Sequence, residues 1–282
     1  MRIKRAWPVL LQPLLLLFAI VIGLGSFVLV ASGKSKAPKA RKTPQAPEGP
    51  PPSILMVGDS LSVGKFGEVV QSHLARKYPV AAYAYCGSSP EHWLSAEPDF
   101  FTKCGYRQHT GNTDVLRDFV NGKPPRPAVT PKLSTLLDRH KPTILVVQLG
   151  TNWMDRSLTD EQMSGYLDQF VHEAHRGSVQ EIIWIAPPDS ARLRKVQGRV
   201  YQILSRAATR RGFQIIDSRK VTHYVMGKTG GDGIHYNTES SEAWAHSIQS
   251  ELDAKLEPTE VREKNLREKK FSQLMREDQA GD

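Results

Sequence analysis

The chain has 282 residues and a net charge of +9, and 39% of its residues are hydrophobic. This length suits one substantial domain with appendages, because a single hydrophobic core commonly serves up to about 250 residues. Eight basic residues and one acidic residue lie within residues 1–48, which leaves only +2 for the remainder. That remainder lacks the broad basic field that binds phosphate backbones, and no helix-turn-helix or zinc-finger spacing occurs, so we expect no nucleic-acid partner.

An uncharged apolar segment follows three basic residues at the N-terminus. No charged residue occurs from Ala6 through Gly33, and Leu14–Ala31 is almost wholly apolar. About 20 apolar residues suffice to span a bilayer, and preceding basic residues favour a cytoplasmic N-terminus. We predict that residues 1–33 are a cytoplasmic end and single transmembrane helix, with the rest periplasmic or extracellular. Small residues at 30–33 leave a cleaved signal peptide as the alternative, although its apolar region is usually shorter, about 7–15 residues.

Two further segments flank the predicted domain at 53–256. Residues 34–52 are rich in Lys, Ala and Pro and end in Pro50-Pro51-Pro52, without apolar periodicity. They are interpreted as an extended tether. Residues 257–282 carry six basic and seven acidic residues and are interpreted as a charged, solvated tail.

Within the domain, short apolar runs alternate with amphipathic stretches. Buried strands are predicted at 54–57, 80–85, 143–149, 182–186 and 214–217, and helices at 65–77, 131–140, 160–178, 190–211 and 239–255. This alternation predicts an α/β fold in which helices cover both faces of a parallel sheet. We expect three layers, α/β/α, with a flavodoxin-like five-stranded sheet and its active site at the carboxyl ends of the strands.

Residues 86–130 lack a clear period and are interpreted as a long insertion over one end of the sheet. Cys86 and Cys104, the two cysteines of the chain, lie in this segment. An exported location would permit a disulfide between them, and two buried free thiols are the alternative. Their spacing does not indicate a metal site.

Two short segments carry residues suited to acyl transfer. The first strand leads into Gly58-Asp59-Ser60-Leu61-Ser62, which places Ser60 at a strand exit just before a helix. A serine hydroxyl is a weak nucleophile and needs a base and an acceptor for developing negative charge. In Asp232-Gly233-Ile234-His235, Asp232 could orient the His235 ring as that base.

Together with two further positions, these segments resemble the SGNH hydrolases, also called the GDSL family. Its four sequence blocks occur in family order across about residues 53–255: Gly58–Ser62, Gly87, Gly150-Thr151-Asn152, and Asp232–His235. The resemblance implies a catalytic triad of Ser60, His235 and Asp232. It also implies an oxyanion hole formed by the Ser60 and Gly87 backbone N–H groups and the Asn152 side chain, with no metal or cofactor.

One position departs from the family pattern. Many members have aspartate directly after the block-three asparagine, where this chain has Trp153. We therefore expect different hydrogen bonds to support Asn152. Trp93, Trp153 and Tyr236 could form an aromatic platform for a carbohydrate, and core packing is the alternative for each.

These observations predict a membrane-anchored serine esterase acting outside the cytoplasm. A tethered enzyme can reach envelope polymers, so the expected substrate is an O-acetyl group on peptidoglycan or another cell-surface polysaccharide. An O-acetyltransferase, a lipid esterase and a thioesterase use the same serine chemistry and remain alternatives. So does a noncatalytic glycan-binding or scaffold domain of the same fold.

Overall fold

The computed structural model describes residues 51–257, 261–262 and 267–268. The predicted anchor, nearly all of the predicted tether and most of the predicted tail therefore lie outside the described residues. Within the described part, no helix is both long enough and apolar enough to cross a membrane.

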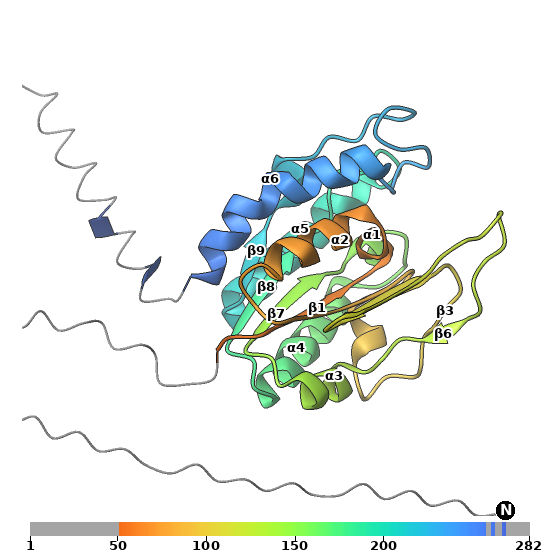
Figure 1. Cartoon of the computed structure of the whole chain (residues 1–282). Coiled ribbons are helices and arrows are strands. Elements are labelled where there is room, and N and C mark those ends of the chain that lie inside the picture. The colour runs from red at the N-terminus through yellow and green to blue at the C-terminus, as the bar shows by residue number, and fades with distance from the viewer. Residues whose placement is uncertain (1–50, 258–260, 263–266, 269–282) are drawn as a thin grey trace, which may run out of the picture. The chain divides into compact units, whose positions relative to one another are not determined.

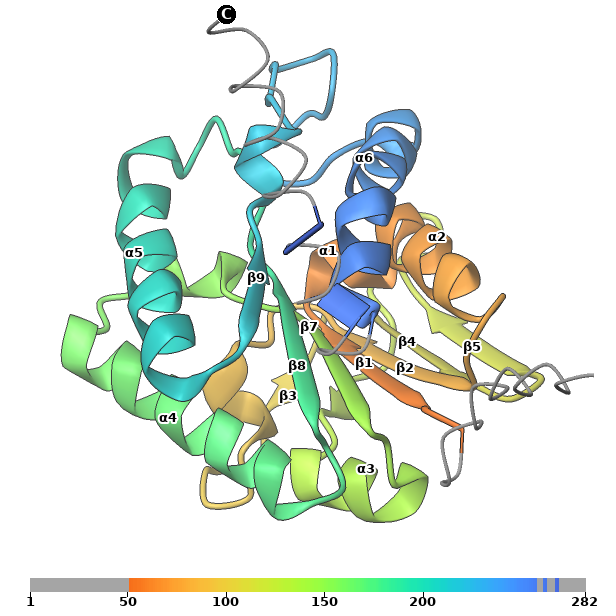
Figure 2. The ribbon, with the colours of Figure 1, turned by 90° about the vertical axis from the view of Figure 1, so that its left-hand side faces the viewer.

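A seven-stranded sheet forms the middle layer, in the order β5-β4-β2-β1-β7-β8-β9 (Figures 1 and 2). Its strands are β1 (Ile54–Gly58), β2 (Val80–Tyr85), β4 (Tyr106–Thr110), β5 (Thr113–Arg117), β7 (Ile144–Gln148), β8 (Glu181–Ile185) and β9 (Gln214–Ile216). The helices are α1 (Ser60–Val63), α2 (Lys65–Leu74), α3 (Leu133–His140), α4 (Asp160–Arg176), α5 (Arg194–Arg211) and α6 (Thr238–Leu256). Short 3₁₀ turns are η1 (Pro90–Trp93), η2 (Thr151–Trp153) and η3 (Ser218–Lys220), and β3 (Phe101–Thr102) pairs with β6 (Ala128–Val129).

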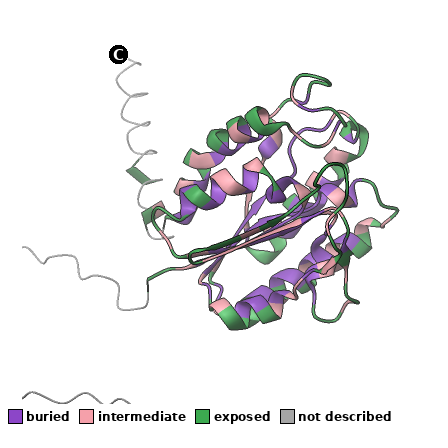
Figure 3. Ribbon diagram, turned by 45° about the vertical axis from the view of Figure 1, so that its right-hand side comes forward, coloured by how far each residue is buried: buried purple, intermediate pink, exposed green. Residues whose placement is uncertain are grey.

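The five predicted strands form the parallel part of this sheet. They run β2-β1-β7-β8-β9, the flavodoxin-like order in which the chain first extends one edge and then the other. Every residue of β1 and β7 is buried, as expected of central parallel strands covered on both faces (Figure 3). Helices α2 and α6 pack over one face, and α3, α4 and α5 pack over the other.

The prediction of a purely parallel, five-stranded sheet was wrong. Strands β4 and β5 form an antiparallel hairpin that adds to the β2 edge and makes the sheet mixed. They come from the segment interpreted as an insertion. A two-residue turn, Gly111-Asn112, joins them, with Gly111 at φ 55° in the left-handed region. Such a Gly-Asn pair between two short runs is a hairpin signal, which the Pro and Gly content of the segment obscured.

Candidate active site

The strand order brings three loops together at the end of the sheet where the parallel strands finish. Parallel β2, β1 and β7 are neighbours, so the segments leaving their carboxyl ends lie side by side. Ser60 follows β1, Gly87 follows β2 and Asn152 follows β7. Asp232 and His235, the fourth predicted block, lie in the loop before α6.

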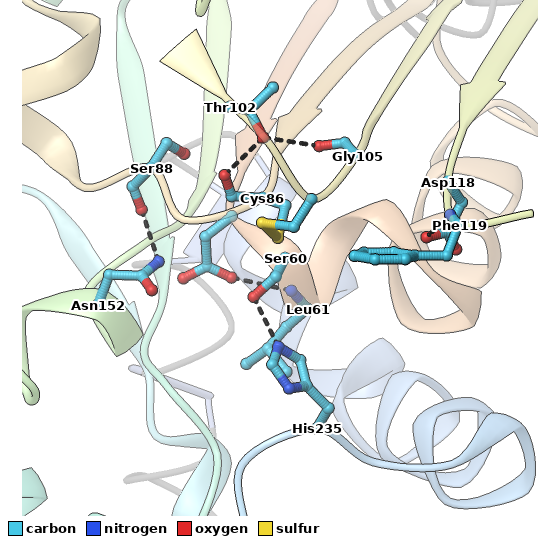
Figure 4. Close-up of a disulfide and its surroundings, with 12 residues drawn as sticks. Ser60, Leu61, Cys86, Ser88, Thr102, Gly105, Asp118, Phe119, Asn152 and His235 are labelled. Carbon is cyan, nitrogen blue, oxygen red and sulfur yellow. Dashed lines mark hydrogen bonds between the residues drawn. A yellow bond between two sulfur atoms is a disulfide. The ribbon is translucent and has the colours of Figure 1, made fainter. Parts of the chain in front are cut away.

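Ser60, His235 and Asp232 form a continuous hydrogen-bonded relay (Figure 4 shows its first contact). Ser60 Oγ lies 2.9 Å from His235 Nε2, and His235 Nδ1 lies 2.5 Å from Asp232 Oδ2. When Nδ1 carries the ring proton and donates a hydrogen bond to Asp232, Nε2 is free to accept the proton of Ser60. The structure thus joins the three residues in the geometry that a serine nucleophile requires.

Asp232 is held as a carboxylate. Its Oδ1 accepts the backbone N–H groups of Ile234 and His235 at 2.9 and 2.7 Å. Partial burial acts to raise the pKa of Asp232, but the His235 ring and these two N–H donors outweigh it and lower that pKa to about 2. The residue therefore stays charged at neutral pH and can support an imidazolium.

Two residues that sequence reasoning did not single out shape the turn that carries His235. The Tyr224 hydroxyl donates to the His235 carbonyl at 3.0 Å and accepts from the Gly233 N–H at 3.1 Å. Ser190 Oγ donates to the Gly233 carbonyl at 2.7 Å. Gly233 has φ 85°, a backbone conformation that favours glycine. These contacts come from other elements, so no local pattern could have revealed them.

Asn152 faces the loop after β2. Its Nδ2 donates to the Ser88 carbonyl at 2.8 Å, next to Gly87, which has φ 79° (Figure 4). An amide nitrogen carries two hydrogens, so this bond orients the group and leaves one N–H for a ligand. The Ser60 N–H stands at the first position of α1, where a helix leaves its N–H groups without intrahelical acceptors.

Trp93 and Trp153 do not form the aromatic platform considered from the sequence. Their exposed fractions are 0% and 1%, so neither can contact a substrate in this structure. Each instead donates its indole N–H to a residue of the loop that follows β2: Trp93 to Ser88 Oγ at 3.3 Å, and Trp153 to Glu91 Oε2 at 2.7 Å. Both tryptophans are packed in the core, the alternative considered for them from the sequence.

Tyr236 lies near Ser60 and His235. It lines the same hollow as Ser60 and His235, and its hydroxyl donates to the Asp189 carbonyl at 2.7 Å. A hydroxyl held in this way fixes the ring at the wall of the hollow. Its role as a substrate contact stays a prediction.

Cys86 and Cys104 form a disulfide with a Cα–Cα distance of 5.5 Å, which leaves no free cysteine in the chain (Figure 4). The buried Thr102 hydroxyl lies within hydrogen-bond distance of the carbonyls of Cys86 and Gly105, at 2.8 and 3.1 Å. These contacts fix the start of β4 against the residue that precedes Gly87. The disulfide therefore supports one wall of the site.

Asp59 is a fully buried carboxyl directly before Ser60. Burial raises its pKa to about 6, against the lowering effects of the Leu61 N–H, the Thr151 and Gln148 side chains and the charge of His235. Its Oδ1 accepts the Leu61 N–H at 3.0 Å and so caps α1. Asp59 thus shapes the turn that presents Ser60.

Comparisons with known proteins bear on the fold. Neither a scan against protein-family models nor a search of curated protein sequences gives a match. Among solved structures, Est24, a carbohydrate acetylesterase from Sinorhizobium meliloti, is similar over 72% of this chain and 99% of its own, with a TM-score of 0.51 and 13% identity. TesA is similar over 72% and 99%, with a TM-score of 0.50 and 18% identity. At these identities the likeness establishes a shared fold, consistent with the SGNH hydrolase fold that the four sequence blocks imply.

Proposed function

We propose that this protein is a serine esterase that removes an O-acetyl group from peptidoglycan or another envelope polysaccharide. The relay from Ser60 through His235 to Asp232 carries the proposal, because it joins a nucleophile, a base and an orienting carboxylate in hydrogen-bond contact. Est24, which has this fold, is a carbohydrate acetylesterase, so the fold accommodates the proposed chemistry.

The reaction follows from the geometry. Ser60 Oγ attacks the ester carbonyl while His235 Nε2 takes its proton, and the resulting oxyanion faces the Ser60 and Gly87 N–H groups and Asn152. The tetrahedral intermediate collapses to an acyl-serine as His235 protonates the leaving alcohol. Water, deprotonated by the same base, then releases acetate and restores Ser60. Asp232 remains ionised throughout and stabilises the imidazolium.

The nucleophile can be tested without knowledge of the substrate. The full-length chain, purified in detergent, is treated with a fluorophosphonate probe, and the labelled peptide is located by mass spectrometry. We expect labelling at Ser60 that Ser60→Ala abolishes and that Ser250→Ala, which changes an exposed serine of α6, does not affect. Absence of labelling, together with intact glycan binding, would favour a noncatalytic domain.

Substrate and reaction type need a second assay. Wild type, Ser60→Ala and Asp232→Asn are incubated with 4-nitrophenyl acetate and with acetylated envelope glycans, and free acetate is measured. Asp232→Asn should lower kcat by about four orders of magnitude, because it favours the wrong histidine tautomer. Acetyl groups recovered on an added sugar acceptor instead of as acetate would indicate an acetyltransferase. If wild type turns over no ester, the esterase proposal fails.

We further propose that the N-terminal segment anchors the protein with its catalytic domain outside the cytoplasm. The uncharged run from Ala6 through Gly33 and the basic residues before it support this topology. Protease added to intact spheroplasts should then digest the domain and leave a short membrane-bound fragment. A mature N-terminus near residue 33, found by sequencing, would instead indicate a cleaved signal peptide.

A further inference from the structure

A hollow of about 360 Å³ lies beside the nucleophile. Ser60 and His235 line it together with the Cys86–Cys104 disulfide, and Phe119 closes another part of its rim. Sites for small ligands commonly measure about 300–1,000 Å³. The hollow therefore has room for one sugar unit next to the reacting hydroxyl.

Phe119 is an unusual feature of this rim. Its exposed fraction is 52%. Figure 4 shows its ring extending toward the side on which Ser60 and the disulfide lie. A large aromatic face left in solvent beside a nucleophile costs hydration free energy that a bound ligand would recover.

The backbone holds Phe119 in place. Directly after it, Val120 and Lys123 exchange two backbone hydrogen bonds of 3.0 Å around Asn121-Gly122, and both turn residues have positive φ, 51° and 74°. Asn-Gly with two positive φ angles is the sequence preferred in a tight type I′ hairpin turn. Phe119 therefore stands at the base of a closed hairpin and not in a loose loop.

Strand β5, which ends two residues before Phe119, connects this turn to the loop that carries Gly87. Arg117, two residues before Phe119, pairs with Tyr106 at the start of β4. Tyr106 follows Cys104 by two residues, and the disulfide joins Cys104 to Cys86, beside Gly87. A short path of strand pairing and covalent bonds thus connects Phe119 to the loop that carries Gly87.

The wall also includes the apolar Leu61 and Val63, and two further residues carry charges. Lys65 contributes an ammonium group paired with Glu68 at 3.2 Å, and Asp118 contributes a carboxylate whose Oδ1 accepts the Phe119 N–H at 2.7 Å. Among the described residues, Asp118 Oδ2 has no hydrogen-bond partner, so it can accept from a ligand hydroxyl. A fatty acyl chain would leave Asp118 Oδ2 without a partner, whereas a sugar presents a hydroxyl to it and its C–H face to the ring.

We infer that this hollow binds the sugar unit that carries the ester, with the sugar ring stacked on Phe119 and its hydroxyls directed to Asp118 and Lys65. The inference rests on the proposed esterase function and assigns the residues that hold the sugar unit at that site. It assigns to Phe119 the platform role considered above for the buried Trp93 and Trp153.

The test compares full-length wild type with Phe119→Ala and Phe119→Trp on two esters. One is 4-nitrophenyl acetate, which has no sugar, and the other is an O-acetylated oligosaccharide of N-acetylglucosamine. Phe119→Ala should lower the ratio of kcat/KM for the sugar ester to that for 4-nitrophenyl acetate by about tenfold, the upper range for an aromatic contact. Phe119→Trp should restore that ratio to within about threefold.

Phe101→Ala provides the matched control. Phe101 lies on β3 with an exposed fraction of 53%, nearly that of Phe119, but it does not line the hollow. Its variant should leave both activities near wild type. Equal losses on both esters in Phe119→Ala, or the same change of ratio in Phe101→Ala, would overturn the inference. So would a greater loss on 4-nitrophenyl palmitate, which would make the hollow an acyl-chain site.

A binding measurement separates this inference from the esterase proposal. Calorimetry on Ser60→Ala reads sugar binding without turnover, and adding Phe119→Ala should weaken the affinity for the acetylated oligosaccharide by about tenfold. Unchanged affinity would contradict the subsite even if the enzyme hydrolyses esters. If the wild type turns over no ester but sugar binding still depends on Phe119, only the esterase proposal is contradicted.

Discussion

Trp153 donates its indole N–H to Glu91 Oε2 at 2.7 Å, and this buried bond joins the loop after β2 to the loop after β7. Arg156 contacts the other oxygen of the same carboxylate at 2.5 Å. Burial raises the pKa of Glu91 against the lowering effects of its hydrogen bonds and of Arg156. Because the two loops carry Gly87 and Asn152, the bond holds two proposed oxyanion donors at a set separation. It also accounts for the tryptophan that stands where many SGNH hydrolases have aspartate.

Trp153→Phe should lower kcat on 4-nitrophenyl acetate by about tenfold while KM changes less, because loosened loops stabilise the transition state more weakly than they bind the ground state. Loss of the donor to a buried carboxylate should also reduce the free energy of unfolding by about 1–3 kcal/mol. Steady-state kinetics and urea denaturation measure the two effects. Trp244→Phe is the control, since the structure gives the buried Trp244 indole N–H no hydrogen-bond partner. Equal losses of kcat in Trp153→Phe and Trp244→Phe would contradict a role of Trp153 in positioning the two loops.

Asn152→Ala should lower kcat by about 10²–10³-fold, the usual loss for one oxyanion donor. The Asn152 amide is oriented by the Ser88 carbonyl at 2.8 Å, so its second hydrogen is available without reorganisation. KM should change little, because the interaction develops with the charge on the oxygen. Gln169→Ala, which removes an exposed amide from α4, serves as the control. A loss confined to KM would mean that Asn152 binds substrate and does not stabilise the oxyanion.

Replacing both cysteines with alanine should reduce the free energy of unfolding by about 2–4 kcal/mol, because the disulfide closes a loop between residues 18 apart in sequence. Activity should fall as well, since Cys86 directly precedes Gly87. Chemical denaturation and ester hydrolysis, each with and without reductant, measure these effects. Reductant should change the wild type and leave the double variant unaffected. Equal stability of the two proteins under oxidising conditions would contradict a stabilising role.

Asp59 gives the unfolding free energy a pH dependence of defined sign. Its pKa is about 6 in the folded chain and 3.8 ordinarily, so the folded state favours the protonated carboxyl. Protonated Asp59 therefore adds to the free energy of unfolding below about pH 4, and this contribution is lost as the pH rises through 6. Asp59→Asn, which is always neutral, should therefore be more stable than wild type at pH 8, by up to about 3 kcal/mol, and nearly equal to it at pH 4. Urea denaturation across this range checks the sign, and parallel curves would contradict the raised pKa.

The regular elements of the parallel sheet could be predicted because their signals are local. Ile144–Gln148 is an unbroken apolar run, which indicates a strand buried on both faces, and α4 begins at a capping box formed by Thr159 and Gln162. The hairpin of β4 and β5 was missed because β4 is only partly buried, β5 is mostly exposed, and neither carries a clear alternation. Its one strong signal, Gly111-Asn112, is two residues long.

The sequence by itself indicated the candidate reacting residues, because the blocks around Ser60, Gly87, Asn152 and His235 directly follow predicted strands or precede a helix, and its apolar runs indicated the five parallel strands. Only the tertiary structure decided how the aromatic residues are used. The sequence around a single tryptophan or phenylalanine does not show whether its side chain is exposed, since burial depends on segments far away in the chain. Packing buried Trp93 and Trp153 and left Phe119 exposed in the hollow that Ser60 also lines.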